Sequence, residues 1–494
     1  IHREVKFAGL DAALFFVDGF AKDDVMTLIL RSLSKVSPDD IKVRDKTTLQ
    51  EIFLKYINYI EVGKETDLNQ VVEQVLAGPL ALLVDGEEEA IILDVREYPG
   101  RSPEEPDLEK VVRGSRDGFT ETLVFNTTLI RRRLRDPQLR FEIMQAGRRS
   151  KTDIAIAYIK DIANPELVDS IKNRIQNIEI DALPMAEKAV EELITPGSYW
   201  NPYPKVRFTE RPDVAAVHLT EGHVLVLVDT SPSIIITPST FFHHLQHAEE
   251  YRQNPTVGVY TRWVRFVGIL LSIFVLPLWF LGSIEPQILP ESLKFIGPEK
   301  TGPIPLFIQF LMAEVAIDFI RLATIHVPAP LATAAGVIAA VLIGDLAASI
   351  GFFIPEVILY TAIAAIGTFL TPSVEIAMAN RLVRLLLLVL AATFKLPGLI
   401  VGSILVVLFL ATAKSFGIPY LWPLIPLNIK ALGNILVRSP VPVGNIRPSA
   451  LKPIDRTSQR VTRTSEVDQT KGDEVPEELV DEPKRKIIKP KKLI

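Results

Sequence analysis

Residues 264–284 read VRFVGILLSIFVLPLWFLGSI, an apolar run of 21 residues with Trp263 and Trp279 near its edges. At 1.5 Å of rise per residue, a helix of this length crosses a hydrocarbon core about 30 Å thick. The run therefore predicts a transmembrane helix. Because Arg252, Arg262 and Arg265 lie at its amino-terminal end, the positive-inside rule places the preceding residues in the cytoplasm.

The charge distribution along the chain supports a membrane part. Of the 494 residues, 48% are hydrophobic, and residues 266–428 contain 15 charged residues whereas the other 331 contain 98. This split excludes a purely soluble enzyme and predicts a large water-facing part joined to a membrane part. The absence of Cys excludes a disulfide scaffold, thiolate metal sites and a cysteine nucleophile. The chain as given opens without a secretory signal, so we expect the first 265 residues to stay on the side where they are made.

The water-facing part before the membrane is predicted to form two α/β domains, residues 1–97 and 127–250, joined by a Pro-rich linker over residues 98–126. Each domain is long enough to bury its own core. In the first we expect helices at 24–35, 47–60 and 69–76 and strands at 80–84 and 90–95. In the second we expect a basic helix around Arg131–Arg133, helices at 165–176 and 185–193, strands at 139–145, 153–159, 214–219, 224–228 and 234–237, and a hairpin turn at Glu221-Gly222.

Motifs for catalysis or cofactor binding are absent from this region. No G-x-G-x-x-G or G-x-S-x-G occurs, and Gly63-Lys64 lacks the surroundings of a phosphate loop, so we expect neither an enzyme nor a cofactor. His243, His244 and His247 could present imidazoles to a metal, but no carboxylate stands at a known spacing among them. We interpret them as part of a solvated helix leading to the membrane. The Arg131–Arg135 cluster lies in an acidic region without interleaved aromatics, which favours a solvated face or a subunit or lipid contact over nucleic-acid binding.

The membrane part, residues 251–428, is expected to be an all-α bundle. Both termini are predicted to be cytoplasmic because Arg381, Arg384 and Lys414 favour that side, so the number of crossings is even. Six crossings are preferred; four remain the alternative if residues 303–324 lie in the interface and one later segment is re-entrant. After residues 264–284 the candidate spans are 303–324, 331–354, 356–371, 382–395 and 399–414, the last two forming a helical hairpin around Pro397-Gly398.

Charged residues within these spans are the clearest functional signal. A charge in hydrocarbon costs roughly 3 kcal/mol or more, so it usually faces protein or water. Glu314, Asp318 and Arg321 share one helical face and could pair among themselves, either as a packing cluster or along an ion path. Asp345 ends a run of small residues, 332–345, which could pack helices closely or leave room for a lumen.

A second polar face follows on the next segment. Thr361, Ala365 and Thr368 share one side of a helix. If several subunits turned this face toward a common axis, it would line a narrow pore. In a lone subunit it would be a packing seam. We therefore take Thr361, Ala365, Thr368 and Asp345 as candidate pore-lining residues.

Several motifs stand out along the chain: TLIRRRLRDP at 128–137, GRRSKTDIA at 147–155, IANP at 162–165, TERPDVA at 209–215 and PYLWP at 419–423. Together they resemble the spore-germination receptor A-subunit family, the GerA family, over about residues 5–450. Segments 325–328, 336–345 and 355–360 resemble most closely the stage V sporulation protein AF branch of that family.

The resemblance implies an integral protein of the spore inner membrane whose soluble domains face the spore core. It also implies a homo-oligomer, a pentamer, that forms an ion channel opened during germination and acts with a small partner membrane protein and other germination membrane proteins. The alternative is a non-conducting scaffold that assembles or positions germination receptors or a permease. The chain continues beyond the resemblance in a basic tail, residues 429–494, which we expect to be disordered and cytosolic, with lysine clusters that could touch anionic lipid.

Overall fold

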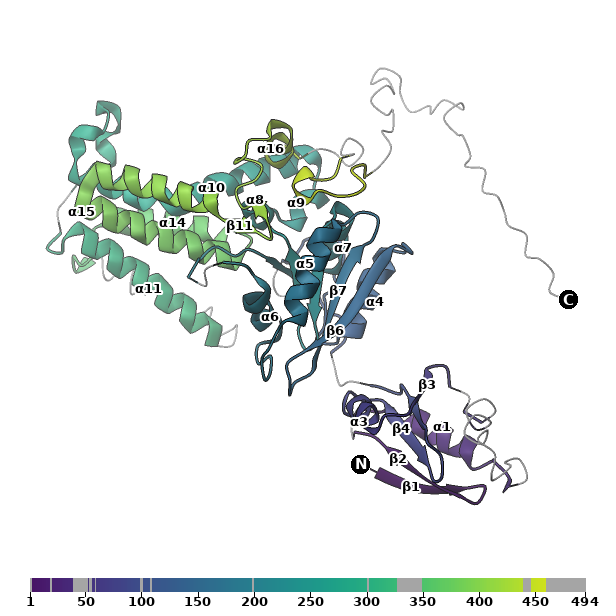
Figure 1. Ribbon diagram of the computed structural model, residues 1–494. Coiled ribbons are helices and arrows are strands. Elements are labelled where there is room, and N and C mark those ends of the chain that lie inside the picture. Colours follow the sequence, from purple (N-terminus) through teal and green to yellow (C-terminus); the bar gives the residue numbers. More distant parts are fainter. Residues whose placement is uncertain are drawn as a thin grey trace, which may run out of the picture.

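The computed structural model describes residues 2–17, 20–38, 52, 56–57, 59–97, 101–106, 109–197, 200–299, 302–326, 349–438 and 446–458. The expected helix at 47–60 lies mostly outside the described residues, as do most of the expected span at 331–354 and the tail beyond residue 458. The expectation of a disordered tail from residue 429 was wrong for its first part, because Ile429–Leu436 form the helix α16 and Ser449–Leu451 form the short helix η5. Figure 1 shows two mixed α/β units followed by a helical bundle.

The first unit contains a five-stranded antiparallel sheet in the order β1-β2-β4-β5-β3. The strands expected at 80–84 and 90–95 are present, and so are the helices expected at 24–35 and 69–76. Apolar residues of β4 and β5 pack with those of α1 in the core. The bounds are β1 His2–Phe7, β2 Leu10–Phe15, α1 Asp23–Leu33, β3 Val62–Glu65, α3 Leu68–Leu76, β4 Leu80–Val84 and β5 Ala90–Leu93.

The second unit has another five-stranded antiparallel sheet, in the order β6-β7-β9-β10-β8, with helices on both faces. Alternation along β7 separates the two layers: Ala155 and Ala157 pack under α4 and α7, whereas Ile154 and Ile156 pack under α5 and α6. The bounds are α4 Leu123–Arg133, β6 Leu139–Ala146, β7 Thr152–Ile159, α5 Pro165–Gln176, α6 Ala186–Ile194, β8 Arg207–Thr209, α7 Pro212–Glu221, β9 Val224–Val228 and β10 Ile234–Thr237.

The prediction of a strand at 214–219 was wrong, because this segment is the helix α7. Pro212 occupies the first turn, where the missing N–H costs no hydrogen bond. Gly222 ends the helix with φ of 103°, so Glu221-Gly222 is a helix end rather than a hairpin turn. A short apolar run has no decisive period, and these two end signals decide the structure.

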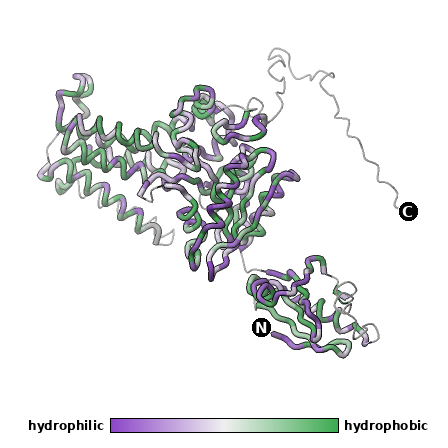
Figure 2. The backbone as a smooth tube through the Cα atoms, viewed as in Figure 1, coloured by the Kyte–Doolittle hydropathy of each residue, from purple (hydrophilic) through white to green (hydrophobic). Residues whose placement is uncertain are grey.

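Among the residues that the structure describes, two helices are long and apolar enough to cross a membrane, α10 with 30 residues and α15 with 39 when both sides of its kink are counted, and α14 is a shorter apolar helix. Exposed side chains of α10 and α15 include many Leu, Val, Ile and Phe. In Figure 2 the backbone of the helical bundle is coloured largely green, the colour of hydrophobic residues. An apolar exterior of this extent suits lipid better than water. The bounds are α8 Phe241–Leu245, α9 Ala248–Arg252, α10 Pro255–Ile284, η2 Pro286–Ile288, η3 Glu291–Ile296, α11 Leu306–His326, α14 Pro355–Phe369, α15 Val374–Thr412, β11 Lys414–Ser415, β12 Ile418–Pro419, α16 Ile429–Leu436 and η5 Ser449–Leu451.

Helix α15 reverses direction near its middle. Lys395 has non-helical angles (φ 54°, ψ −140°). A Cβ added to Gly402 would lie 3.0 Å from Leu387 and 2.6 Å from Leu390, although a continuous helix would separate Gly402 and Leu387 by about 22 Å. The two halves therefore form the helical hairpin expected around Pro397-Gly398. The number of crossings, six or four, stays a prediction, and most of the candidate span 331–354 lies outside the described residues.

Candidate functional site

A buried charge cluster connects three helices of the bundle. Glu314 on α11 accepts hydrogen bonds at Oε2 from Arg381 Nε (3.1 Å) and from Arg384 Nη2 (2.8 Å), both on α15. Arg381 also pairs with Asp318, one turn farther along α11. Arg384 Nη1 donates to the carbonyl oxygen of Ser272 on α10. The cluster thus connects α10, α11 and α15.

The charge cluster is buried, so losing one of its members should cost much of the free energy of folding. Glu314, Arg381 and Arg384 are only 1%, 3% and 2% exposed. Removing one member of a buried ion pair leaves an uncompensated charge and typically costs about 3–5 kcal/mol. One Glu314 oxygen, Oε1, and one Arg384 nitrogen, Nε, have no hydrogen-bond partner among the described residues. The cluster is therefore polar and only partly satisfied, in an otherwise apolar bundle.

Arg381 and Arg384, used above only as cations that favour the cytoplasmic side, lie in the helical first half of α15 and supply the positive partners of Glu314 and Asp318. Arg321, expected to pair within its own helix, donates to the Met378 sulfur on α15. Arg381 and Arg384 are three positions apart and Glu314 and Asp318 are four apart, so each pair lies on one face of its helix. These two spacings are the signal in the sequence that could have indicated that the pairs meet.

The face of α14 that carries Thr361 and Thr368 packs inside the chain. Both side chains are buried, whereas Ala365 is half-buried. Thr368 donates to the carbonyl oxygen of Ala364 (2.9 Å) and accepts from Arg384 Nη1 (3.3 Å), so it extends the charge cluster to α14. The Thr361 hydroxyl has no hydrogen-bond partner among the described residues. Within one chain this face is a packing seam; its role in lining a pore stays a prediction. Asp345 lies outside the described residues.

Small residues bring α14 close to α10 at this seam. A Cβ added to Gly367 would lie 2.2 Å from the carbonyl oxygen of Gly268 and 3.0 Å from Ser272. No real Cβ approaches a backbone atom so closely, so only glycine allows the contact. Glycine and serine at helix crossings are typical of membrane bundles, because they let backbones approach.

A second buried ion pair lies where the bundle joins the soluble part. Arg262, expected among the cations flanking the membrane, is 1% exposed and donates to Glu250 of α9 (2.7 Å). Arg262 also donates to the carbonyl oxygen of Ile435 (2.7 Å), and Arg438 donates to the carbonyl oxygen of Glu250 (2.9 Å). These contacts attach α16 and the start of α10 to α9.

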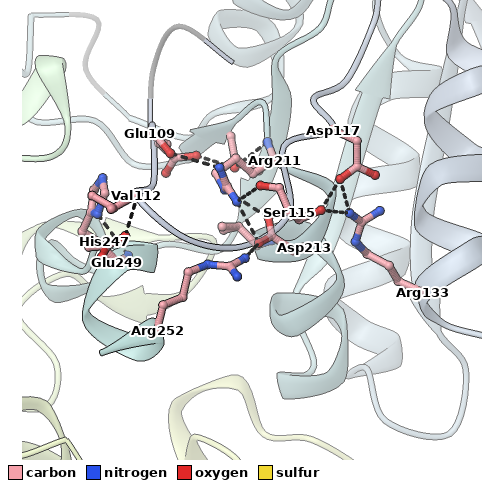
Figure 3. Close-up of polar contacts among 12 residues, drawn as sticks. Glu109, Val112, Ser115, Asp117, Arg133, Arg211, Asp213, His247, Glu249 and Arg252 are labelled. Atoms are coloured by element: carbon pink, nitrogen blue, oxygen red, sulfur yellow. Dashed lines mark hydrogen bonds and ion pairs between the residues drawn. The ribbon is translucent and has the colours of Figure 1, made fainter. Parts of the chain in front are cut away.

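The linker is attached to the second α/β unit by a network of polar contacts (Figure 3). Arg211, which is fully buried, donates to the carbonyl oxygen of Ser115 (2.9 Å) and forms a two-bond pair with Asp213 (3.1 and 3.0 Å). Arg252 of α9 also pairs with Asp213. Burial alone would raise the pKa of Asp213, but Arg211 and Arg252 hold it below its usual value. The network therefore connects the linker to the helices that lead into the bundle.

Two carboxylates of the linker, those of Glu109 and Asp117, extend this network. Glu109 accepts from Arg207 Nη2 (2.8 Å) and from the Thr209 hydroxyl (2.6 Å), both on β8. Asp117 pairs with Arg133 at 2.5 Å (Figure 3). Arg133 belongs to the basic cluster expected on a solvated face, so at least this arginine is used to hold the linker.

Of the three histidines expected on a solvated helix, His243 and His244 are buried instead, and His247 is half-buried. His243 accepts at Nδ1 from the backbone N–H of Thr240 (3.2 Å), and His244 Nε2 lies 3.1 Å from the Ser239 hydroxyl. His247 accepts from the backbone N–H of Glu249 (3.2 Å). These rings cap or brace short helices. No group of three or more potential metal ligands occurs among the residues that the structure describes.

Two histidines that the sequence did not single out join His243. His218 and His223 stack with ring centroids 4.9 Å apart, and the His223 and His243 rings lie 5.0 Å apart. None of the ring nitrogens of His218 and His223 has a hydrogen-bond partner among the described residues. Burial, and to a smaller degree the neighbouring cations, lower the pKa of both rings well below 6.5. The rings are therefore neutral in the folded protein.

Comparison with known proteins gives a consistent result. The family model described as "Bacillus/Clostridium GerA spore germination protein" matches residues 1–450. The chain is 49% identical over 457 residues to stage V sporulation protein AF of Bacillus subtilis (strain 168), covering 92% of both chains. It is 31% identical over 462 residues to spore germination protein GerLA of Bacillus cereus, again covering 92% of both. It is 30% identical over 446 residues to the uncharacterized membrane protein YfkQ of Bacillus subtilis, covering 89% of this chain and 85% of YfkQ.

A solved structure also matches, the N-terminal domain of the A subunit of the Bacillus megaterium spore germinant receptor GerK3. The identity is 27%, the match covers 49% of this chain and 88% of that one, and the TM-score is 0.22.

Proposed function

Because this chain belongs to the Bacillus/Clostridium GerA spore germination protein family, we propose that it is a subunit of an oligomeric ion channel in the spore inner membrane. In this proposal the chain has no enzymatic role, and the channel promotes ion release during germination. Both termini lie on the core side of the membrane. The subunits form a pentamer that works with a small partner membrane protein and other germination membrane proteins.

The observation that supports this proposal best is the buried charge cluster around Glu314. Ionisable side chains inside a bundle with a lipid-facing exterior are costly and are commonly retained for ion passage or gating. Arg384 contacts Glu314 on α11, the Ser272 carbonyl on α10 and Thr368 on α14. A rotation of α14 cannot occur without changing the contacts of this one guanidinium.

Rotation of α14 is also the step that links the cluster to a pore. Thr361 and Thr368 are buried in the seam against the bundle, which corresponds to a non-conducting arrangement. Turning the helix about its axis would present these hydroxyls and Ala365 to a shared axis, together with Asp345 of the preceding span. Hydroxyls between apolar constrictions would then line the pore.

Planar-bilayer recording of the purified protein, with and without its partner membrane protein, tests the proposal, alongside the oligomer mass in detergent. We expect current from an oligomer. An assembled oligomer that conducts no current, with or without the partner, overturns the channel and leaves the non-conducting scaffold as the function.

A further inference from the structure

A basic cavity lies where the bundle meets the second α/β unit. Its volume is about 850 Å³, and it is lined by α5, by the segment before β8, by the turn between β11 and β12 and by the residues around η5. Figure 1 places β11 next to α5, at the soluble end of α15. Cavities of this size hold small organic ligands.

The charges that line the cavity are unbalanced. Four cations, Arg174, Lys205, Lys414 and Lys452, face one carboxylate, Glu166. Within the part of the chain that the structure describes, none of the four cations forms an ion pair. Four positive charges gathered around a single carboxylate repel one another, and an anion in the cavity would relieve that repulsion.

Two of the cations are held in place by contacts that leave their charge uncompensated. Arg174 Nη1 donates to the carbonyl oxygen of Ile194 (3.2 Å), and its guanidinium lies 6.0 Å from the centre of the Phe416 ring. Lys205 Nζ donates to the carbonyl oxygen of Pro196 (2.5 Å). Burial lowers the pKa of Lys205. Lys414 and Lys452 are exposed at the mouth and free to adapt.

The cavity lining also contains apolar side chains, those of Phe416, Ile418 and Trp422. A ligand that matches this lining carries a compact anionic group with several acceptor oxygens and an organic part. Guanidinium and ammonium groups together match the oxygens of a phosphate. We propose that this cavity binds a phosphate ester, either the headgroup of an anionic phospholipid or a free organic phosphate. The proposal does not depend on ion conduction.

Two double variants of equal charge change test the cavity. Lys414→Gln with Lys452→Gln removes two exposed cations from its mouth, whereas Lys160→Gln with Lys430→Gln removes two exposed lysines elsewhere. Because the first variant loses two cations that would face the anionic group, we expect it to bind at least about tenfold more weakly, and we expect the second to bind as the unmodified protein does. Glu166→Gln removes the opposing carboxylate and should tighten binding severalfold.

The probes separate the two sources of phosphate. Two preparations of the full-length protein in detergent are used. Delipidated protein is titrated with glycerol 3-phosphate by calorimetry. Native mass spectrometry counts the phosphatidylglycerol retained by protein that has not been delipidated. Binding of both probes, or of glycerol 3-phosphate alone, identifies a free phosphate ester as sufficient; retention of phosphatidylglycerol alone identifies a lipid headgroup. Binding of neither probe overturns the proposal, and so does equal binding by the two double variants.

Discussion

Arg384 on α15 donates to the carboxylate of Glu314 on α11 at 2.8 Å, and the two residues lie 70 positions apart in the sequence. Both are buried, and both retain one polar atom without a partner among the described residues. The pair joins α11 to α15, and α14 lies between these two helices in the sequence. The presence of this ion pair therefore reports directly whether α11 and α15 are packed against each other.

Replacing either partner of this pair should destabilise the bundle strongly. We expect Glu314→Gln to lower the free energy of unfolding by about 3–5 kcal/mol, because Arg381 and Arg384 lose their shared counter-charge. The double variant Glu314→Gln with Arg384→Gln should lose less than the sum of the single variants. Thermal unfolding in detergent measures these losses. Arg149→Gln, which removes an exposed partner of Asp181, serves as control and should cost under about 1 kcal/mol; an equal loss in control and test would contradict this interpretation.

The crossing of α10 and α14 should not tolerate a methyl group. We expect Gly367→Ala to destabilise the bundle by about 1–3 kcal/mol, because its Cβ would lie 2.2 Å from the Gly268 carbonyl oxygen and the helices would have to separate. Gly433→Ala on α16 is the matched control, since an added Cβ meets nothing within 4 Å. Unfolding temperatures of the two variants give the comparison. An unchanged unfolding temperature for Gly367→Ala would show that the helices do not cross there.

The candidate pore residues can be separated from residues needed only for folding. Thr361→Val keeps the shape and removes a hydroxyl that has no partner among the described residues, so stability should change little. Under the proposed rotation, Thr361→Val and Ala365→Phe should both alter single-channel conductance in planar bilayers. Leu405→Phe, at an exposed position on α15, provides a control for added bulk. Normal conductance in assembled Ala365→Phe would remove this face from the pore.

Acid should weaken the second α/β unit through its histidines. His218 and His223 have lowered pKa values in the folded protein, whereas an unfolded imidazole has a pKa of about 6.5. Below pH 6.5 the unfolded state therefore binds protons that the folded state does not, and stability falls as the pH falls, by about 1 kcal/mol per histidine per pH unit. Above pH 7 the effect vanishes.

The experiment compares the unmodified protein with His218→Phe/His223→Phe from pH 8 to pH 5. Only the difference between the two profiles reports the histidines, because other titrating groups contribute to the profiles of both proteins. We expect the free energies of unfolding of the two proteins, each plotted against pH, to converge as the pH falls. Parallel profiles would mean that the rings are protonated in the folded state. His2→Gln, at an exposed histidine, should leave the profile unchanged.

Loosening Arg211 should release the linker. Arg211→Lys removes the planar pair with Asp213 and the contact with the Ser115 carbonyl, so residues 109–119 should be cleaved by trypsin or chymotrypsin at least several times faster. Arg149→Lys, whose side chain is exposed and pairs with Asp181 outside the linker, is the control. Equal cleavage rates in both variants would exclude Arg211 as the anchor of the linker.

The sequence predicted the helices and strands with clear periods and missed those that depend on long-range pairing. Helix α5 begins and ends where its Pro and its apolar period place it. Strands β1 and β2 at the chain start were not predicted, because their alternation is weak and they are stabilised by pairing with each other and with β4. The misassigned helix α7 shows that Pro212 and Gly222 outweigh a short apolar run.

The candidate site was predicted in composition but not in connectivity. The sequence singled out Glu314 and Asp318 because charges in an apolar helix are costly, a local argument. It could not assign their partners, since Arg381 and Arg384 also satisfied a topology rule that counts flanking cations. Only the packing of α11 against α15 shows that these arginines are ion-pair partners of Glu314 and Asp318 and do not simply flank a span. The same holds for His218 and His223, which meet His243 only through the fold.

The reversal of α15 at Lys395 has a mechanical consequence. The first half of the hairpin is attached to the second α/β unit by the Tyr203 hydroxyl, which donates to Asn380 (3.1 Å). Just after the second half, the Ser415 hydroxyl accepts from the Ser239 backbone N–H (3.1 Å) and donates to the Lys205 carbonyl oxygen (2.6 Å). Both arms thus share one base. A movement of that base tilts the two arms together, and sliding one arm along the other would first require one attachment to break.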